Sequence, residues 1–241
     1  MPISPTELAL ALLVVTLGAV VQASVGFGLA LIAAPILLLV EPAMIPGPLM
    51  AASLVLTGLV VHRERAHVDL SGMVFAAGGR VVGTALAAIF LATASARDFD
   101  LGFGILVVLG VVFTAGYPDL RPGRTTSLLA GGVSGLMGTI SSIGGPPMAL
   151  LYQSSGAARL RGTLAGFFIF GTIVSVAVLA AIGRFGWLEV QLALLLCPAM
   201  ALGFALAGPF RARVSDDAIR PLVIGLSLVA AAVVLVRAIV A

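Results

Sequence analysis

The sequence contains no lysine and no asparagine, and it has a single cysteine and only two histidines. Cys197 alone excludes a disulfide or a cysteine-based metal centre within one chain. His62 and His67 share one loop without clustered carboxylates nearby, so we expect neither a metal site nor a nucleophile–base pair. These absences argue against an enzyme, and no cofactor is expected.

Charge is also scarce. Charged residues make up 10% of the chain, against roughly a quarter in soluble domains. The net charge of +3 comes from arginines scattered in short loops, not gathered on one face, so we expect no nucleic-acid partner. Apolar residues reach 61%, and the mean hydropathy is +1.22. The composition therefore predicts an all-α integral membrane protein whose main partner is the lipid bilayer.

Charged residues divide the chain into apolar stretches. Six of these have the length of one membrane crossing, which is about 20 residues. They are residues 43–61, 70–93, 99–116, 162–183, 187–208 and 218–236. Two stretches are longer, because Leu8 to Val40 runs for 33 uncharged residues and Thr125 to Ala158 for 34.

Each long stretch is interrupted near its middle. The first contains Gln22-Ala-Ser-Val-Gly-Phe-Gly28, and the second contains Gly138-Thr-Ile-Ser-Ser-Ile-Gly-Gly-Pro-Pro147. Glycine and proline at this density stop a helix. We therefore predict two re-entrant hairpins, 8–40 and 125–158, with arms of about 12 to 18 residues. Kinked helices that cross the membrane fully are the alternative.

The arginines favour hairpins, because positive charge concentrates in cytoplasmic loops. If both long stretches crossed, each side would carry six loop arginines. If both turn back, one side carries nine and the other carries Arg97, Arg184 and Arg237. The nine are Arg63, Arg65, Arg121, Arg124, Arg159, Arg161, Arg211, Arg213 and Arg220. The hairpin arrangement predicts that both termini lie outside the cytoplasm.

The two halves of the chain resemble each other. Val68-Asp69 matches Leu188-Glu189 at an offset of 120, and Ser24-Val-Gly26 matches Ser142-Ile-Gly144 at an offset of 118. We predict two repeats, 1–118 and 122–241, each with one hairpin and three spans. Three crossings invert the second copy, and inverted repeats are typical of secondary transporters with a site at the midplane.

The two hairpin tips are the predicted binding site. Two helices that resume there would point free amide groups and positive dipole ends at one cavity, which suits a small anion. Close helix packing by the glycines is the alternative. The candidate substrate-binding residues are Gln22, Ser24, Gly26, Phe27, Gly28, Ser141, Ser142, Gly144, Gly145 and Pro146.

Arg80 completes the candidate site. It is the only ionisable residue deep within a predicted span, and no acidic residue shares its depth. An arginine there costs roughly 2.5–3.5 kcal/mol on insertion scales, which favours a functional role. A guanidinium without a carboxylate partner suits an anionic substrate such as sulfite or a sulfonate. The alternative is that Arg80 only braces the hairpins.

The motifs of both halves resemble one family. Val25-Gly-Phe-Gly28 with Pro35, and Ile143-Gly-Gly-Pro-Pro147, are similar to the two signatures of the sulfite exporter TauE/SafE family. That family's second half is resembled by the run Arg161-Gly-Thr163, followed by Leu188-Glu189, Gly203, Gly208 and Arg211 to Ser215. Arg80 departs from the common pattern, where a small or apolar residue is expected. The resemblance implies a bacterial inner-membrane permease for sulfite, organosulfonates or related sulfur anions.

The predicted function is therefore a secondary transporter of a small anion that works by alternating access. An anion channel with a re-entrant filter is the main alternative, and a membrane scaffold without transport is another. The direction of transport, coupling to protons or to the membrane potential, and assembly as a homodimer stay open.

Overall fold

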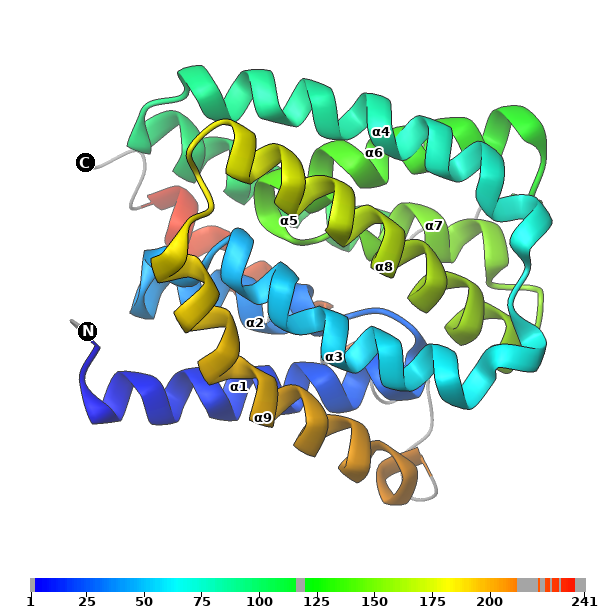
Figure 1. The fold of residues 1–241 in the computed structure, drawn as a ribbon, viewed down its shortest axis with the longest axis horizontal. Helices are drawn as coiled ribbons and strands as arrows, with labels where there is room; N and C mark the ends of the chain where they lie inside the picture. The colour runs from blue at the N-terminus through cyan, green and yellow to red at the C-terminus, as the bar shows by residue number, and fades with distance from the viewer. Residues whose placement is uncertain are drawn as a thin grey trace.

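The computed structural model describes residues 3–115, 120–211 and parts of 221–236, and these residues form helices joined by short links. Figure 1 shows most of the helices lying along the long axis of the molecule. They are α1 (Pro5–Val25), α2 (Leu29–Val40), α3 (Gly47–Glu64), α4 (Leu70–Thr93), α5 (Ala96–Ala115), α6 (Arg124–Ser141), α7 (Gly145–Tyr152), α8 (Ala157–Ala181) and α9 (Trp187–Arg211), with short 3₁₀ turns at Pro42–Met44 and Arg65–His67. The all-α fold class is confirmed.

Five of these helices, α1, α4, α5, α8 and α9, are long and apolar enough to cross a membrane. Helix α4 begins and ends where the sequence predicts a span. Helix α3 is less apolar than these five helices, because its last turn holds His62, Arg63 and Glu64. The predicted span 218–236 lies only partly within the described residues, and Arg213, Arg220, Arg237 and the repeat boundary at 118 lie outside them.

Helix α1 differs from the expected hairpin arm. It has 21 residues, about 31 Å of helix, because Ser4 caps its start in a capping box with Glu7 and Pro5 follows at the first position. The helix that returns, α2, has only 12 residues. Helices α6 and α7 show the same contrast, with 18 and 8 residues. Each interruption therefore joins a long helix to a short one.

The chain turns at the two interruptions through left-handed backbone. We call Gly26–Gly28 the first break and Ser142–Gly144 the second break. Gly26 (φ +110°) and Ser142 (φ +64°) each end a long helix and donate an N–H to the carbonyl four residues back. Gly28 and Gly144 each precede a short helix. The two breaks therefore correspond at an offset of 116, two residues from the offset of 118 inferred from sequence likeness.

The helices pack in matched pairs. In the predicted repeat, α1, α2, α3 and α4 correspond in order to α6, α7, α8 and α9. The contact of α4 with α6 then corresponds to the contact of α9 with α1. The contact of α3 with α9 corresponds in the same way to the contact of α8 with α4. The contact of α1 with α2 likewise becomes that of α6 with α7. The inverted repeat stays a prediction, and this exchange supports it.

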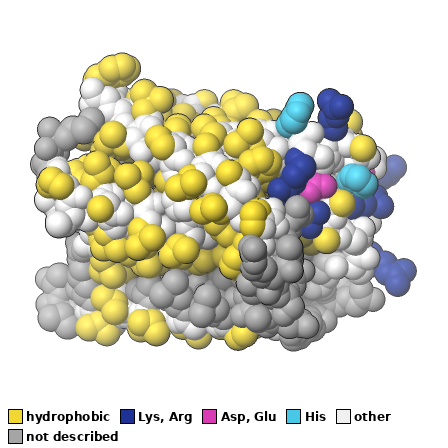
Figure 2. All heavy atoms as spheres, turned by 90° about the horizontal axis from the view of Figure 1, so that it is seen from below, with side chains coloured by type: hydrophobic (Ala, Val, Ile, Leu, Met, Phe, Trp, Pro, Cys, Tyr) yellow, Lys and Arg dark blue, Asp and Glu magenta, His cyan; other side chains and the backbone are white. Residues whose placement is uncertain are grey.

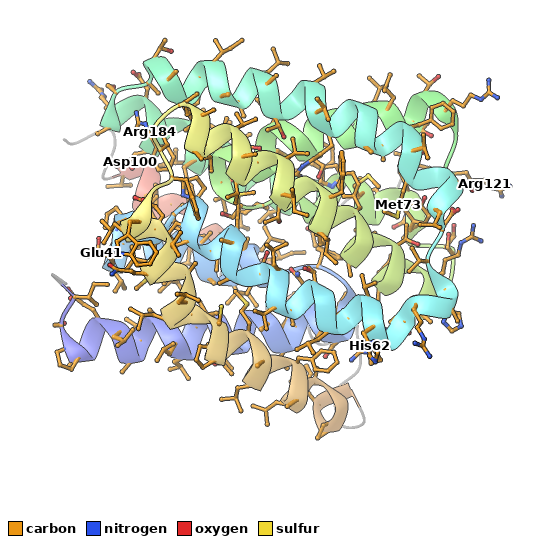
Figure 3. The ribbon with its side chains drawn as sticks, viewed as in Figure 1. Glu41, His62, Met73, Asp100, Arg121 and Arg184 are labelled. Carbon is orange, nitrogen blue, oxygen red and sulfur yellow. The ribbon has the colours of Figure 1, made fainter. Side chains whose placement is uncertain are left out.

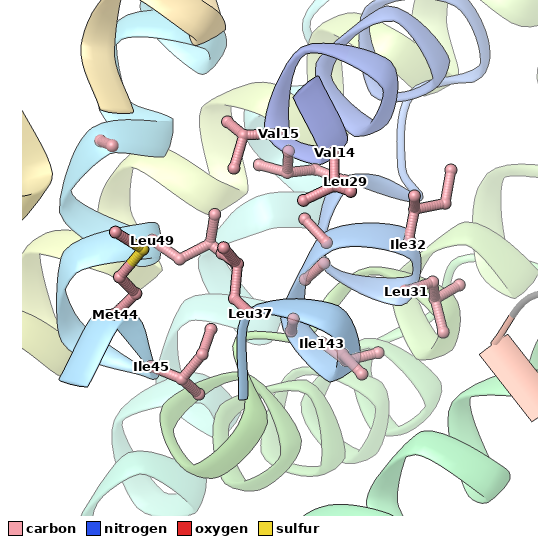
Figure 4. Close-up of a cluster of buried hydrophobic side chains, with 14 of the residues drawn as sticks. Val14, Val15, Leu29, Leu31, Ile32, Leu37, Met44, Ile45, Leu49 and Ile143 are labelled. Atoms are coloured by element: carbon pink, nitrogen blue, oxygen red, sulfur yellow. The ribbon is translucent and has the colours of Figure 1, made fainter. Parts of the chain in front are cut away.

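Apolar side chains enclose both breaks. Figure 4 shows Leu29, Leu31, Ile32 and Leu37 of α2 packed with α1, while Ile143 of the second break lies in the same cluster. Nearly every residue of α2 is buried. Irregular backbone within a membrane needs such cover, because its polar groups find no water there.

The charged side chains gather at the two ends of the molecule. In Figure 3, Glu41, Asp100 and Arg184 lie at one end, and His62 and Arg121 lie at the other. The second end, which we call the basic end, holds six of the described arginines, and Figure 2 shows arginine side chains in dark blue gathered at one end of a largely apolar surface. They are Arg63, Arg65, Arg121, Arg124, Arg159 and Arg161. Which side of a membrane this end faces stays a prediction.

Helices α4 and α6 touch backbone to backbone. A Cβ at Gly79 would overlap the carbonyl oxygen of Leu128, and one at Gly83 would overlap that of Gly132. Small residues allow such an approach between membrane helices. The contact also determines where Arg80, between these two glycines, meets α6.

We expect Gly79→Ala to lower the free energy of unfolding by about 1–3 kcal/mol, because overpacking forces the two backbones apart. Gly78→Ala is the matched control, since a Cβ at Gly78 would meet only the Leu128 Cδ1 atom at 3.7 Å. The measurement is thermal unfolding of both purified variants in detergent. Equal stability of the two variants would contradict the close contact.

Candidate functional site

The two breaks lie against each other inside the helical bundle. A Cβ at Gly145 would lie 2.7 Å from the Cβ atom of Phe27, so the glycine allows the breaks to approach. A cavity of about 50 Å³ lies beside this contact. Its wall takes residues from α1, α2, α3, α4, α6, α7, α8 and both breaks. The sequence predicts this meeting of the two breaks.

Seven of the eleven predicted site residues line the cavity: Gln22, Gly28, Arg80, Ser142, Gly144, Gly145 and Pro146. The wall also contains residues that the sequence analysis missed, namely Leu29, Ala30, Leu31, Leu49, Met50, Ser53, Gly138, Ile143, Phe168 and Thr172. Those from α3 and α8 lie far from either break in sequence. The only feature of the sequence that could have indicated these residues is the presence of polar Ser53 and Thr172 within apolar helices.

Arg80 brings a buried positive charge to the cavity wall, since its side chain is only 3% exposed. Nη1 donates to the backbone oxygen of Ser134 at 2.7 Å and to its hydroxyl at 3.1 Å. Nη2 donates to the Ser175 hydroxyl at 3.3 Å. Nε has no hydrogen-bond partner, although a buried donor normally has one.

Three glycines make room for the guanidinium. A Cβ at Gly138 or Gly144 would lie 2.7 Å from Nη1, and one at Gly171 would lie 2.5 Å from Nε. The ring of Phe167 covers the guanidinium at 5.7 Å from its centroid, a distance that allows a cation–π contact. Glycines of α6, the second break and α8 thus form the pocket for a side chain from α4.

Hydroxyl groups connect Arg80 to its surroundings. Ser134 donates its hydroxyl to the carbonyl oxygen of Gly144 while accepting from Arg80. Ser175 also bonds the hydroxyl of Thr139, which in turn donates to Thr84. Nη1 therefore bonds Ser134 of the predicted second hairpin, Nη2 bonds Ser175 of α8, and Nε has no hydrogen-bond partner.

The start of α2 adds donors to the same cavity. The N–H groups of Leu29, Ala30 and Leu31 occupy the first turn, where a helix offers them no acceptor. Helix α7 contributes less, because Pro146 and Pro147 carry no N–H. The two helix starts were expected to be equivalent, and proline chemistry makes them unequal. None of the described residues that line the cavity is acidic.

The profile of the sulfite exporter TauE/SafE family matches residues 10–234. The chain belongs to this family. The search of curated proteins and the search of solved structures found no match. The TauE/SafE family consists of membrane transporters of sulfur anions and not of enzymes, so the chain is a multi-pass membrane transporter.

Four predicted site residues of this TauE/SafE chain lie outside the cavity wall: Ser24, Gly26, Phe27 and Ser141. The hydroxyls of Ser24 and Ser141 donate to carbonyls of their own helices, and Ser141 also accepts the N–H of Ile143. Gly26 packs on Leu160 and Arg161. These residues shape the breaks, because short polar side chains at a helix end bond the local backbone first.

Charged residues of the TauE/SafE chain surround the end of α1. Arg63 donates through Nη2 to the carbonyl of Ala23 at 2.7 Å, and Arg161 donates through Nη1 to that of Ser24 at 3.5 Å. Both arginines also bond Oε1 of Glu64. The carbonyls that the first break leaves without helical donors are thus satisfied by arginine.

Asp69 makes a second charged contact at the basic end. Its Oδ1 accepts the N–H of Gly72 and the hydroxyl of Ser71, and its Oδ2 accepts Arg159 at 3.0 Å and the Tyr152 hydroxyl. Burial alone would raise the pKa of Asp69, but hydrogen bonds from Ser71, Gly72 and Arg159 outweigh it and lower the pKa to about 2. The ionised carboxylate therefore stabilises the start of α4.

We expect this contribution to depend on pH with a defined sign. The folded pKa of about 2 lies below the unfolded value near 3.8, so the stabilisation is complete above about pH 4 and is lost as pH falls toward 2. Melting temperatures of the wild type and Asp69→Asn in detergent should differ most above pH 4 and converge near pH 2. A difference that does not change with pH would show that the charge of Asp69 contributes nothing.

Proposed function

We propose that the cavity binds a compact sulfur oxyanion, sulfite or a relative such as thiosulfate, and carries it by alternating access. The observation that carries this proposal is the buried guanidinium of Arg80, which lines a cavity without acidic residues and has one nitrogen, Nε, without a hydrogen-bond partner. A buried charge is costly unless it is paired. A bound anion would pair it, and an organosulfonate is the broader substrate class.

The donors around the cavity suit an oxyanion. Arg80 supplies a charge with a planar set of donors, and the first turn of α2 supplies amide groups at the positive end of a helix dipole. Gln22, Ser53 and Thr172 add polar side chains to the wall. Several donors converging from different helices can replace the hydration shell of an oxyanion.

The size of the cavity favours a small substrate. A cavity of about 50 Å³ is small beside the pockets of about 300–1,000 Å³ that hold drug-sized ligands. Sulfite, one sulfur with three oxygens, is a small anion. A longer organosulfonate would need the wall of Leu49, Met50 and Phe168 to widen.

The packing supports a transporter over a channel. The largest helix contacts map onto one another when the two halves are exchanged, which is the arrangement that lets one half rock against the other around a central site. Coupling to protons or to the membrane potential, a bacterial inner-membrane location with termini outside the cytoplasm, and a homodimer remain part of this proposal.

The first experiment measures sulfite binding to purified protein by calorimetry. We expect Arg80→Gln to weaken binding at least about 100-fold, because removing the charged partner of a buried pair costs about 3 kcal/mol. Arg97→Gln is the control, since Arg97 is an exposed arginine at the start of α5 and does not line the cavity. It should bind like the wild type.

Ser175→Ala separates binding from bracing, because it removes only one acceptor of the guanidinium. It should lower the melting temperature while binding weakens less than in Arg80→Gln. Sulfite affinity that is unchanged in folded Arg80→Gln would remove Arg80 from the substrate site and leave it as a brace.

A second experiment distinguishes the transporter from the channel. Sulfite flux into proteoliposomes should saturate with concentration, because each carrier must change conformation once per cycle. Flux should also fall in parallel with binding in Arg80→Gln. Ohmic single-channel currents carried by sulfite would instead establish the channel.

A further inference from the structure

The first break lies between the cavity and the basic end. On one side of it, Gln22 and Gly28 line the cavity. On the other side, the carbonyls of Ala23 and Ser24 accept hydrogen bonds from arginines. Gly26 is packed against Leu160 and Arg161 at the start of α8. The first break therefore separates the cavity from the arginines at this part of the basic end.

Three charged residues hold the first break in place. Glu64 accepts Arg63 Nε at 3.1 Å and Arg161 Nε at 3.0 Å on the same oxygen, Oε1. The side chains of Glu64 and Arg161 are only 9% and 11% exposed. We call these three residues the Glu64 clamp. It joins the end of α1 to α3 and α8, and Arg63 also lies over the Phe204 ring of α9 at 5.0 Å.

The second break has a different fastening. The hydroxyl of Ser142 donates to the carbonyl of Pro46, in the link before α3, at 3.1 Å. This is a neutral hydrogen bond, whereas the Glu64 clamp uses ionised groups, whose hydrogen bonds are roughly twice as strong. The breaks are thus held unequally, by arginines of the Glu64 clamp at the first break and by the hydroxyls of Ser142 and Ser134 at the second.

We propose that the Glu64 clamp is the gate that closes the cavity from the basic end. This inference rests on the proposed alternating access. Opening on this side requires α1 to separate from α3 and α8, and the hydrogen bonds that hold the end of α1 to these helices come from the two arginines that Glu64 binds. Loss of the carboxylate removes the charged oxygen that both arginines share, which weakens their hold on the first break.

The test follows access to the cavity and needs no substrate. Cys197 is replaced by serine, and Ser53, which lines the cavity and bonds only a carbonyl of its own helix, is replaced by cysteine. A charged methanethiosulfonate reagent then modifies Cys at position 53 in the purified protein. We expect Glu64→Gln to accelerate this modification at least about tenfold, which corresponds to ~1.4 kcal/mol of closing free energy.

Arg161→Gln should act in the same direction, and it provides a second variant if Glu64→Gln does not fold. Arg159→Gln is the matched control, because it breaks an ion pair with Asp69 at the same end without touching the first break. Its modification rate should stay at the wild-type value. Unchanged rates in both clamp variants, or equal acceleration in Arg159→Gln, would overturn the gate.

The rate of cysteine modification is measured without substrate, so it tests the gate independently of sulfite binding. If sulfite fails to bind but the clamp variants still accelerate modification, the gate holds and the proposed substrate is wrong. If sulfite binds through Arg80 and the clamp variants do not alter the rate, the site holds and the gate is elsewhere.

Discussion

Irregular backbone within an apolar environment must be covered by protein, and this requirement organises the whole molecule. Both breaks expose amide and carbonyl groups that a continuous helix would satisfy. The structure buries them against each other and surrounds them with α1, α2 and the apolar cluster that includes Ile143. The cavity exists because two such turns cannot fill the space between them as regular helices would.

Arg80 depends on that arrangement and on glycine. Its guanidinium fits only because Gly138, Gly144 and Gly171 have no side chains, and it reaches Ser134 only because α4 and α6 touch backbone to backbone. The same residue that is costly in a membrane helix therefore links three helices and one break. Two of its nitrogens bond α6 and α8, and the third, Nε, lies against Gly171 without a hydrogen-bond partner.

The two predicted repeats differ in chemistry. Gly26 and Ser142 each have a positive φ at the first residue of a break, and the largest helix contacts exchange. Yet α2 offers free amides where α7 has prolines, and arginines of the Glu64 clamp bond the first break where serine hydroxyls bond the second. The residue that corresponds to Arg80 at the predicted offset of 120 is Met200, which is buried. Because of these differences, the two halves that surround the site are not equivalent, as they would be in a symmetric pair.

The sequence by itself determined the membrane class, the helical fold, the position of both breaks and the place of Arg80 deep within a helix, because charge and helix-breaking residues act locally. Only the tertiary structure decided which residues share the cavity: Ser53, Phe168 and Thr172 arrive from helices distant in sequence, whereas Ser24 and Ser141 turn to their own backbone. It also decided that the breaks correspond at an offset of 116 residues. The residues with positive φ that end α1 and α6, and not residues of similar type, define the equivalent turns. The partners of Arg80 and of Glu64 depend on helix packing, which no local pattern encodes.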